Sequence, residues 1–122
     1  MKVGVIGSRS FTDYDLLKSE LDKIREVSEI TCIVSGGAQG ADILAERYAR
    51  QNRIPTQIFY PDWKKFGKRA GFLRNSDIVR NSEHILSFWN GASRGTMDSI
   101  QKAKELGIPV TVILFGNKKE IE

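Results

Sequence analysis

The stretch ITCIVSGGAQGAD, residues 30–42, decides the fold of this 122-residue chain. A short apolar run leads into a glycine-rich turn, Ser35–Asp42, and the turn leads into a segment with the apolar spacing of a helix. Two other places repeat this order, and their turns are Gly7-Ser8-Arg9 and Asn90-Gly91-Ala92-Ser93-Arg94-Gly95-Thr96. Such turns present backbone N–H groups beside the positive end of a helix dipole. Each is therefore a predicted seat for a phosphate or another anion.

Strand-like and helix-like segments alternate along the whole chain. Short apolar runs rich in β-branched or aromatic residues predict strands at Val3–Ile6, Ile30–Val34, Gln57–Tyr60, His84–Trp89 and Pro109–Phe115. Helical spacing predicts helices over about 14–27, 41–51, 70–81 and 95–106. Because parallel neighbours need crossover connections, we predict an α/β fold, a three-layer Rossmann-like sandwich with a mainly parallel five-stranded sheet. A strand order of 3-2-1-4-5 would bring the three glycine-rich turns to one edge of that sheet.

The ends of two predicted helices have recognisable signals. Thr12 and Asp15 are placed for a capping-box-like start of the first helix. Gly107 reads as the stop of the last helix, in which Met97, Ile100 and Ala103 would form the apolar face.

The composition indicates one soluble globular domain spanning residues 1–122, because 40% of the residues are hydrophobic and 28% are charged. Met1 and Lys2 lead directly into a strand-like run, so we expect a cytoplasmic protein that does not interact with a membrane. The single cysteine, Cys32, is expected in the core. One cysteine and one histidine form no recognisable ligand cluster, so no metal is expected. No cofactor is expected either.

Positive charge is concentrated in one part of the chain. The formal net charge is +4, and residues 64–80 contain one acid, Asp77, among six basic residues: Lys64, Lys65, Lys68, Arg69, Arg74 and Arg80. The stretch is either a solvated helix face or a phosphate-facing loop. Its aromatic residues could stack on bases or pack against the core; we favour packing for Phe66 and Phe72 and leave Trp63 open.

The standard nucleotide signatures are missing. No segment matches G-x-x-x-x-G-K-[ST], and no turn after a strand matches G-x-G-x-x-G, which disfavours ATP or GTP hydrolysis by a P-loop. Gly36 and Gly37 could serve only to make a tight turn. Ser35 and Asp42 add a hydroxyl and a carboxylate that a purely mechanical turn does not need.

Several motifs together resemble the YspA-like branch of the SLOG superfamily, in the right order and over most of the chain. They are Gly7-Ser8-Arg9, Ser35–Asp42, Pro61-Asp62-Trp63 through Gly67, Ala70-Gly71, Arg74-Asn75, Trp89-Asn90-Gly91, Ser93 and Gly95-Thr96. The resemblance implies a Rossmann-like fold and the binding or processing of a ligand of the nucleotide or ADP-ribose type.

Two related groups imply more specific activities. LOG phosphoribohydrolases carry P-G-G-x-G-T-x-x-E, and Ser99 occupies the position of their glutamate, while Arg74 could match their arginine. The neighbouring carboxylate, Asp98, would point about 100° away from Ser99 round the helix. The loss of the glutamate therefore weakens the case for LOG-type hydrolysis. DprA proteins share the Ser-Gly-x-Ala-x-Gly-x-Asp pattern of residues 35–42 and imply binding of single-stranded DNA.

We therefore expect a binding protein for a nucleotide-derived small molecule, with no catalytic residue assigned. The expected ligand-binding residues are Gly7, Ser8, Arg9, Ser35, Gly36, Gly37, Ala38, Gly40, Asp42, Arg74, Asn75, Gly91, Ser93, Gly95 and Thr96. One alternative is a nucleotide N-glycosidase that uses Asp42, Asp62 or Asp98, and another is single-stranded nucleic-acid binding. Trp89 could either floor an adenine pocket or cap the sheet edge, and a homodimer or higher homo-oligomer is possible.

Overall fold

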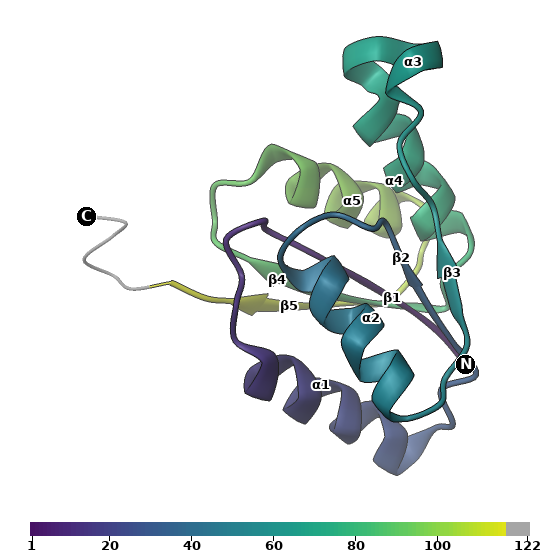
Figure 1. The fold of residues 1–122 in the computed structure, drawn as a ribbon, viewed down its shortest axis with the longest axis vertical. Helices are drawn as coiled ribbons and strands as arrows, with labels where there is room; N and C mark the ends of the chain where they lie inside the picture. Colours follow the sequence, from purple (N-terminus) through teal and green to yellow (C-terminus); the bar gives the residue numbers. More distant parts are fainter. Residues whose placement is uncertain (117–122) are drawn as a thin grey trace.

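A five-stranded sheet in which every strand is parallel runs through the computed structural model, which describes residues 1–116 (Figure 1). Its strands are β1 (Lys2–Gly7), β2 (Cys32–Ser35), β3 (Thr56–Ile58), β4 (His84–Trp89) and β5 (Val110–Leu114). Their order, β3-β2-β1-β4-β5, confirms the predicted order. All five predicted strands form, with ends within two residues of those expected.

Helices cover both faces of the sheet, which confirms the three-layer α/β architecture (Figure 1). They are α1 (Tyr14–Val27), α2 (Ala41–Gln51), α3 (Trp63–Phe66), the 3-10 turn η1 (Gly67–Arg69), α4 (Ala70–Arg80) and α5 (Arg94–Glu105). Helices α1 and α2 pack on one face, and α4 and α5 pack on the other. No helix within residues 1–116 is long and apolar enough to cross a membrane.

The core has two halves because side chains alternate between the faces of a strand. Val3 and Val5 of β1 face α1 and α2, where Leu17 is fully buried. Ile6 faces the other way and packs with Ile78 and other residues of α4 and α5. Burying each such side chain contributes roughly 1.5–3 kcal/mol, so the central strands are held from both sides. Cys32, predicted in the core, is half-buried against the second half.

The capping box predicted for α1 is wrong. Asp13 caps the helix instead, because its side chain accepts a hydrogen bond from the N–H of Leu16 at 3.0 Å. The helix therefore starts one residue later than a cap at Thr12 would require. Toward the other end of the chain, Gly107 has φ +71° directly after Leu106, the C-cap of α5, and ends the helix as expected.

The predicted apolar face of α5 is only partly correct. Ile100 and Ala103 are buried, but Met97 is 42% exposed. Residues three apart on a helix differ in direction by about 60°, so Met97 points about 120° away from Ala103. It therefore lies outside the face of α5 that packs on the sheet.

Residues 62–69, which we call the arm, form a feature that helical periodicity did not predict. They comprise Asp62, α3 and η1; every one of these residues is exposed, and α3 projects beyond the sheet in Figure 1. The side chain of Asp62 starts α3 by accepting from the N–H of Lys65 at 3.1 Å. Phe66 in the arm and Phe72 just after it are 38% and 45% exposed, so the prediction that they pack against the core is wrong.

Candidate functional site

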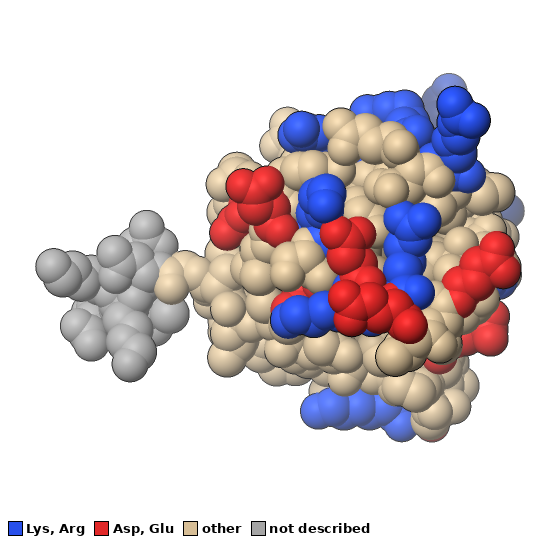
Figure 2. Space-filling model, turned by 90° about the horizontal axis from the view of Figure 1, so that it is seen from below, with Lys and Arg blue, Asp and Glu red and all other residues tan. Residues whose placement is uncertain are grey.

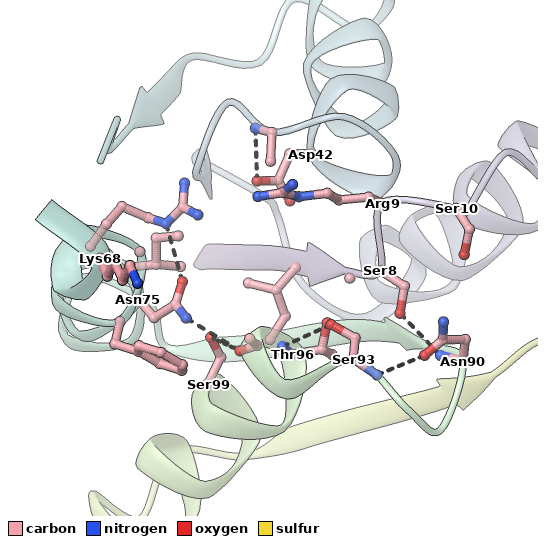
Figure 3. A pocket seen from close by; sticks show the side chains of 18 of the residues that line it. Ser8, Arg9, Ser10, Asp42, Lys68, Asn75, Asn90, Ser93, Thr96 and Ser99 are labelled. Carbon is pink, nitrogen blue, oxygen red and sulfur yellow. Dashed lines mark hydrogen bonds between the residues drawn. The ribbon is translucent and has the colours of Figure 1, made fainter. Parts of the chain in front are cut away.

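The three glycine-rich turns meet around one cavity. They follow β2, β1 and β4, which are neighbours in the sheet, and parallel strands end at the same edge. A cavity of about 500 Å³ lies there and is lined by residues of all three turns together with α4. In Figure 3, Arg9 and Asp42 lie on one side of it, with Ser93 and Thr96 on the other.

The first turn is joined to the third by a buried serine. The N–H of Ser8 donates to the carbonyl of Phe88 at 2.9 Å, and its Oγ accepts from the N–H of Asn90 at 3.1 Å. Ser8 is 2% exposed, so these bonds set the distance between the β1 and β4 turns. Arg9 follows directly and lines the cavity.

The second turn closes on its own carboxylate. Oδ2 of Asp42 accepts hydrogen bonds from the N–H groups of Gly36 at 3.1 Å and Ala38 at 3.2 Å. Two of the N–H groups predicted to hold a phosphate therefore already have an acceptor within the protein.

Asp42 is a nearly buried acid beside two arginines. It is 5% exposed, and burial raises its pKa to about 6 against the opposing effects of the Ala38 N–H, the Arg74 guanidinium and the Gly36 N–H. Burial also lowers the pKa of Arg74; Asp42 opposes this shift and Arg9 adds to it. The Arg74 guanidinium donates from Nη1 to the Gly36 carbonyl at 2.5 Å and from Nε to Oδ1 of Asn75 at 3.1 Å. Arg74 thus braces α4 against the second turn.

The third turn leads into α5 with its hydroxyls gathered at the cavity. Oδ1 of Asn90 accepts from the N–H groups of Ala92 and Ser93, both at 2.9 Å. Ser93 is the N-cap, its Oγ accepting from the Thr96 N–H at 3.3 Å and lying 3.0 Å from the Thr96 hydroxyl. The next N–H groups, of Arg94 and Gly95, precede the first bond of the helical ladder and have no acceptor within α5. They leave the positive end of α5 open to an anion.

A wall of α4 and α5 residues closes the cavity. Asn75 is 7% exposed, and its Nδ2 donates to the Gly95 carbonyl at 3.2 Å and to Oδ2 of Asp98 at 3.3 Å. Asp98 also pairs with Lys102 at 2.8 Å, whereas Ser99 lines the cavity. The position resembling the LOG glutamate is therefore a buried serine, and the adjacent carboxylate is engaged elsewhere.

A second cavity of about 410 Å³ adjoins the first and shares Arg9, Ala38, Trp63 and Arg74 with it. Tyr60 and Pro61, which follow β3, contribute to its lining together with Gly36 and Gly37. The two arginines thus stand where the two spaces meet.

Most of the predicted site residues line one of these cavities. The first is lined by Gly7, Ser8, Arg9, Ala38, Asp42, Arg74, Asn75, Ser93, Gly95 and Thr96. Gly36 and Gly37 line the second, and Ser35, Gly40 and Gly91 line neither.

These last three residues shape the turns. Oγ of the buried Ser35 donates to the Val5 carbonyl at 2.9 Å and ties β2 to β1. Gly40 has φ +85°, and a Cβ there would strike the backbone of Ser8 and Arg9. Gly91 has φ +84° but lies in open space.

Some lining residues were not among the predicted site residues. Ser10, Lys68 and Asn90 line the first cavity, and Tyr60 lines the second. The rule that ligands bind at the carboxyl ends of parallel strands would have found Tyr60, which follows β3. Trp89 does not line either cavity; its Nε1 donates to the Ser93 carbonyl at 3.0 Å and holds the third turn. Within residues 1–116, no three His, Cys, Asp or Glu side chains gather as a metal site would require.

Comparisons with known proteins relate the chain to a family. The model described as "YspA, cpYpsA-related SLOG family" matches residues 1–66, which include the first two turns. The Gene 61 protein of Mycobacterium phage D29 is 36% identical over 124 residues, covering 96% of this chain and 98% of the phage protein. No solved structure matches significantly.

Proposed function

This chain belongs to the YspA, cpYpsA-related SLOG family, and on that premise we propose that it binds a nucleotide-derived small molecule in the cavity of about 500 Å³. Membership indicates nucleotide-related binding or processing. The observation that carries the more specific proposal is the convergence of an open helix N-terminus, hydroxyl groups and an arginine in that cavity.

We place the phosphate at the start of α5. The N–H groups of Arg94 and Gly95 and the hydroxyls of Ser93 and Thr96 would donate to it, as helix N-termini do in other anion sites. Arg9 lines the same cavity and would add a charge-assisted bond. The second turn has a lesser part, because Asp42 already occupies two of its N–H groups.

The base would lie toward the arm. Trp63 and Phe72 line the cavity at 52% and 45% exposure, which leaves their rings available for stacking. A volume of about 500 Å³ is within the usual range for small-molecule sites.

Isothermal titration with AMP, ADP-ribose and cyclic nucleotides tests the proposal, with Gly95→Asp as the site variant. A Cβ at Gly95 meets no atom within 4 Å, and a carboxylate in the first turn of a helix is stabilised by the helix dipole. Gly95→Asp should therefore fold at least as stably, yet bind at least about tenfold more weakly because its charge repels a phosphate.

Gln101→Glu is the matched control, since it adds the same charge on an exposed part of α5. It should bind like the unsubstituted protein. The absence of heat with all of these ligands at high micromolar concentration, or unchanged binding by Gly95→Asp, would refute the proposed site.

Cleavage of the N-glycosidic bond is a second candidate, favoured by one observation. Of the carboxylates considered for this chemistry, Asp42 lines the cavity, whereas Asp62 caps α3 and Asp98 pairs with Lys102. A pKa raised to about 6 suits a general acid near neutral pH. Chromatography of AMP, CMP and NAD incubated with the protein should then show a free base or nicotinamide, and Asp42→Asn should abolish its release. Unchanged substrates at high protein concentration would dismiss this activity.

A further inference from the structure

All of the chain's excess positive charge lies in one short segment. Residues 62–76, the arm and the first half of α4, hold one acid, Asp62, and five basic residues: Lys64, Lys65, Lys68, Arg69 and Arg74. Their net charge of +4 equals that of the whole chain, so the charges of the other 107 residues cancel. Figure 2, seen from the side of α1, shows acidic and basic side chains mixed on that face.

Four of these cations are free to meet a partner. Lys64, Lys65, Lys68 and Arg69 are exposed, and none of them joins the ion pairs found in residues 1–116, which are Lys18–Asp22, Lys23–Glu20 and Lys102–Asp98. The fifth, Arg74, is held against the second turn.

Exposed aromatic rings alternate with these cations along the chain. Trp63, Phe66 and Phe72 are 52%, 38% and 45% exposed, and Lys64–Lys65 and Lys68–Arg69 fall between them. Nζ of Lys65 lies 5.2 Å from the centre of the Phe66 ring. Cations that follow a phosphate backbone, together with rings on which bases stack, are the two components of a single-strand binding surface.

Other occupants fit this segment less well. Lysine is depleted in the cores of protein–protein interfaces, whereas the arm alone has three. Helices that lie on membranes present a long apolar face, whereas α3 has four residues.

We propose that residues 62–76 form a binding surface for single-stranded nucleic acid, which overlaps the rim of the nucleotide cavity at Trp63, Lys68 and Phe72 and binds whether or not that cavity takes a small molecule. The backbone would lie along the four free cations and the bases on the exposed rings. This proposal does not depend on the small-molecule ligand of the cavity.

Fluorescence anisotropy with a labelled oligothymidylate of about 20 nucleotides tests the proposal. Between about 50 and 200 mM salt, four neutralised phosphates should give a slope of log affinity against log salt of about −3. Lys64→Gln/Lys65→Gln should halve that slope and weaken binding about tenfold at low salt. Phe66→Ala, which removes a ring outside both cavities, should weaken binding about fivefold or more.

Arg50→Gln/Lys104→Gln is the matched control, because it removes two exposed positive charges elsewhere. It should bind the oligonucleotide like the unsubstituted protein. Titration of Phe66→Ala with AMP and ADP-ribose separates the two proposals, since a defect at the cavity would change those heats and a defect at the arm would not.

Three outcomes would overturn the proposal. One is unchanged anisotropy at about 100 μM protein, where even typical non-specific binding is populated. Another is equal weakening by both double variants. The third is sedimentation with vesicles of phosphatidylcholine and phosphatidylserine while the oligonucleotide stays unbound, which would assign the surface to anionic membranes.

Discussion

Replacing Asp42 by asparagine should change how stability depends on pH. The carboxyl is 5% exposed, and burial raises its pKa from 3.8 to about 6. Between these two values the folded state keeps a proton that the unfolded state releases, so the unsubstituted protein loses stability as the pH rises through this window. Asparagine keeps an oxygen that can accept from the Gly36 and Ala38 N–H groups, but it carries no charge.

The magnitude follows from the separation of the two pKa values. A difference of about two units, at about 1.4 kcal/mol per unit, corresponds to about 3 kcal/mol once the pH is well above 6. This loss of stability is spread over a range of pH, and about 2 kcal/mol of the roughly 3 kcal/mol is lost between pH 4 and pH 7. Asp42→Asn should therefore gain about 2 kcal/mol relative to the unsubstituted protein over that range.

Urea unfolding of both proteins at several pH values measures the difference. Asp77→Asn is the control, because it removes the same charge from an exposed position on α4. A stability difference for Asp42→Asn that is no steeper with pH than that of the control would refute the reasoning. A relative loss at higher pH would show that Arg74 and the two N–H groups stabilise the carboxylate by more than its burial destabilises it.

Three further predictions concern stability, each measured by urea unfolding. Gly40→Ala should lose more than about 2 kcal/mol, because the positive φ of Gly40 is combined with a clash of the new Cβ against the first turn. Gly91→Ala has a similar φ in open space and should lose about 1 kcal/mol; equal losses by the two variants would show that the clash at Gly40 adds nothing. Ser87→Ala should gain about 1 kcal/mol, since the buried hydroxyl has no hydrogen-bond partner within residues 1–116, and a clear loss would reveal one. Phe11→Ala should lose about 3–5 kcal/mol, because its ring stacks in the core 4.5 Å from a second phenylalanine, whereas Phe66→Ala on the arm should change little; similar losses would mean that the arm is packed.

The strands and long helices could be predicted because their signals are local. Apolar side chains repeat with the period of the element that buries them, and this predicted β4 (His84–Trp89) with both ends correct. The bounds of α1 were predicted correctly, but its cap was assigned to Thr12 instead of Asp13, because both residues are acceptable caps and only the path of the chain into the helix selects between them. The arm was missed because four residues are too few to show a helical period.

The candidate site was predicted in part, for a related reason. Glycine-rich turns after neighbouring strands predicted which segments would meet, and ten of the predicted residues line the larger cavity. Periodicity could not show that Trp89 holds the third turn through Ser93 rather than lining the cavity.

By itself, the order of residues determined the strand and helix pattern and the parallel sheet, because each follows from side chains a few positions apart. The gathering of the three turns at one edge rested on a strand order that only the folded chain fixes. Only the tertiary structure decided which donors at that place are still open. The carboxylate of Asp42 and the amide of Asn90 fill several of them, while the start of α5 is left uncovered. Hydrogen bonds and burial are shared among groups from distant parts of the chain, so the outcome of that competition exists only once the chain is folded.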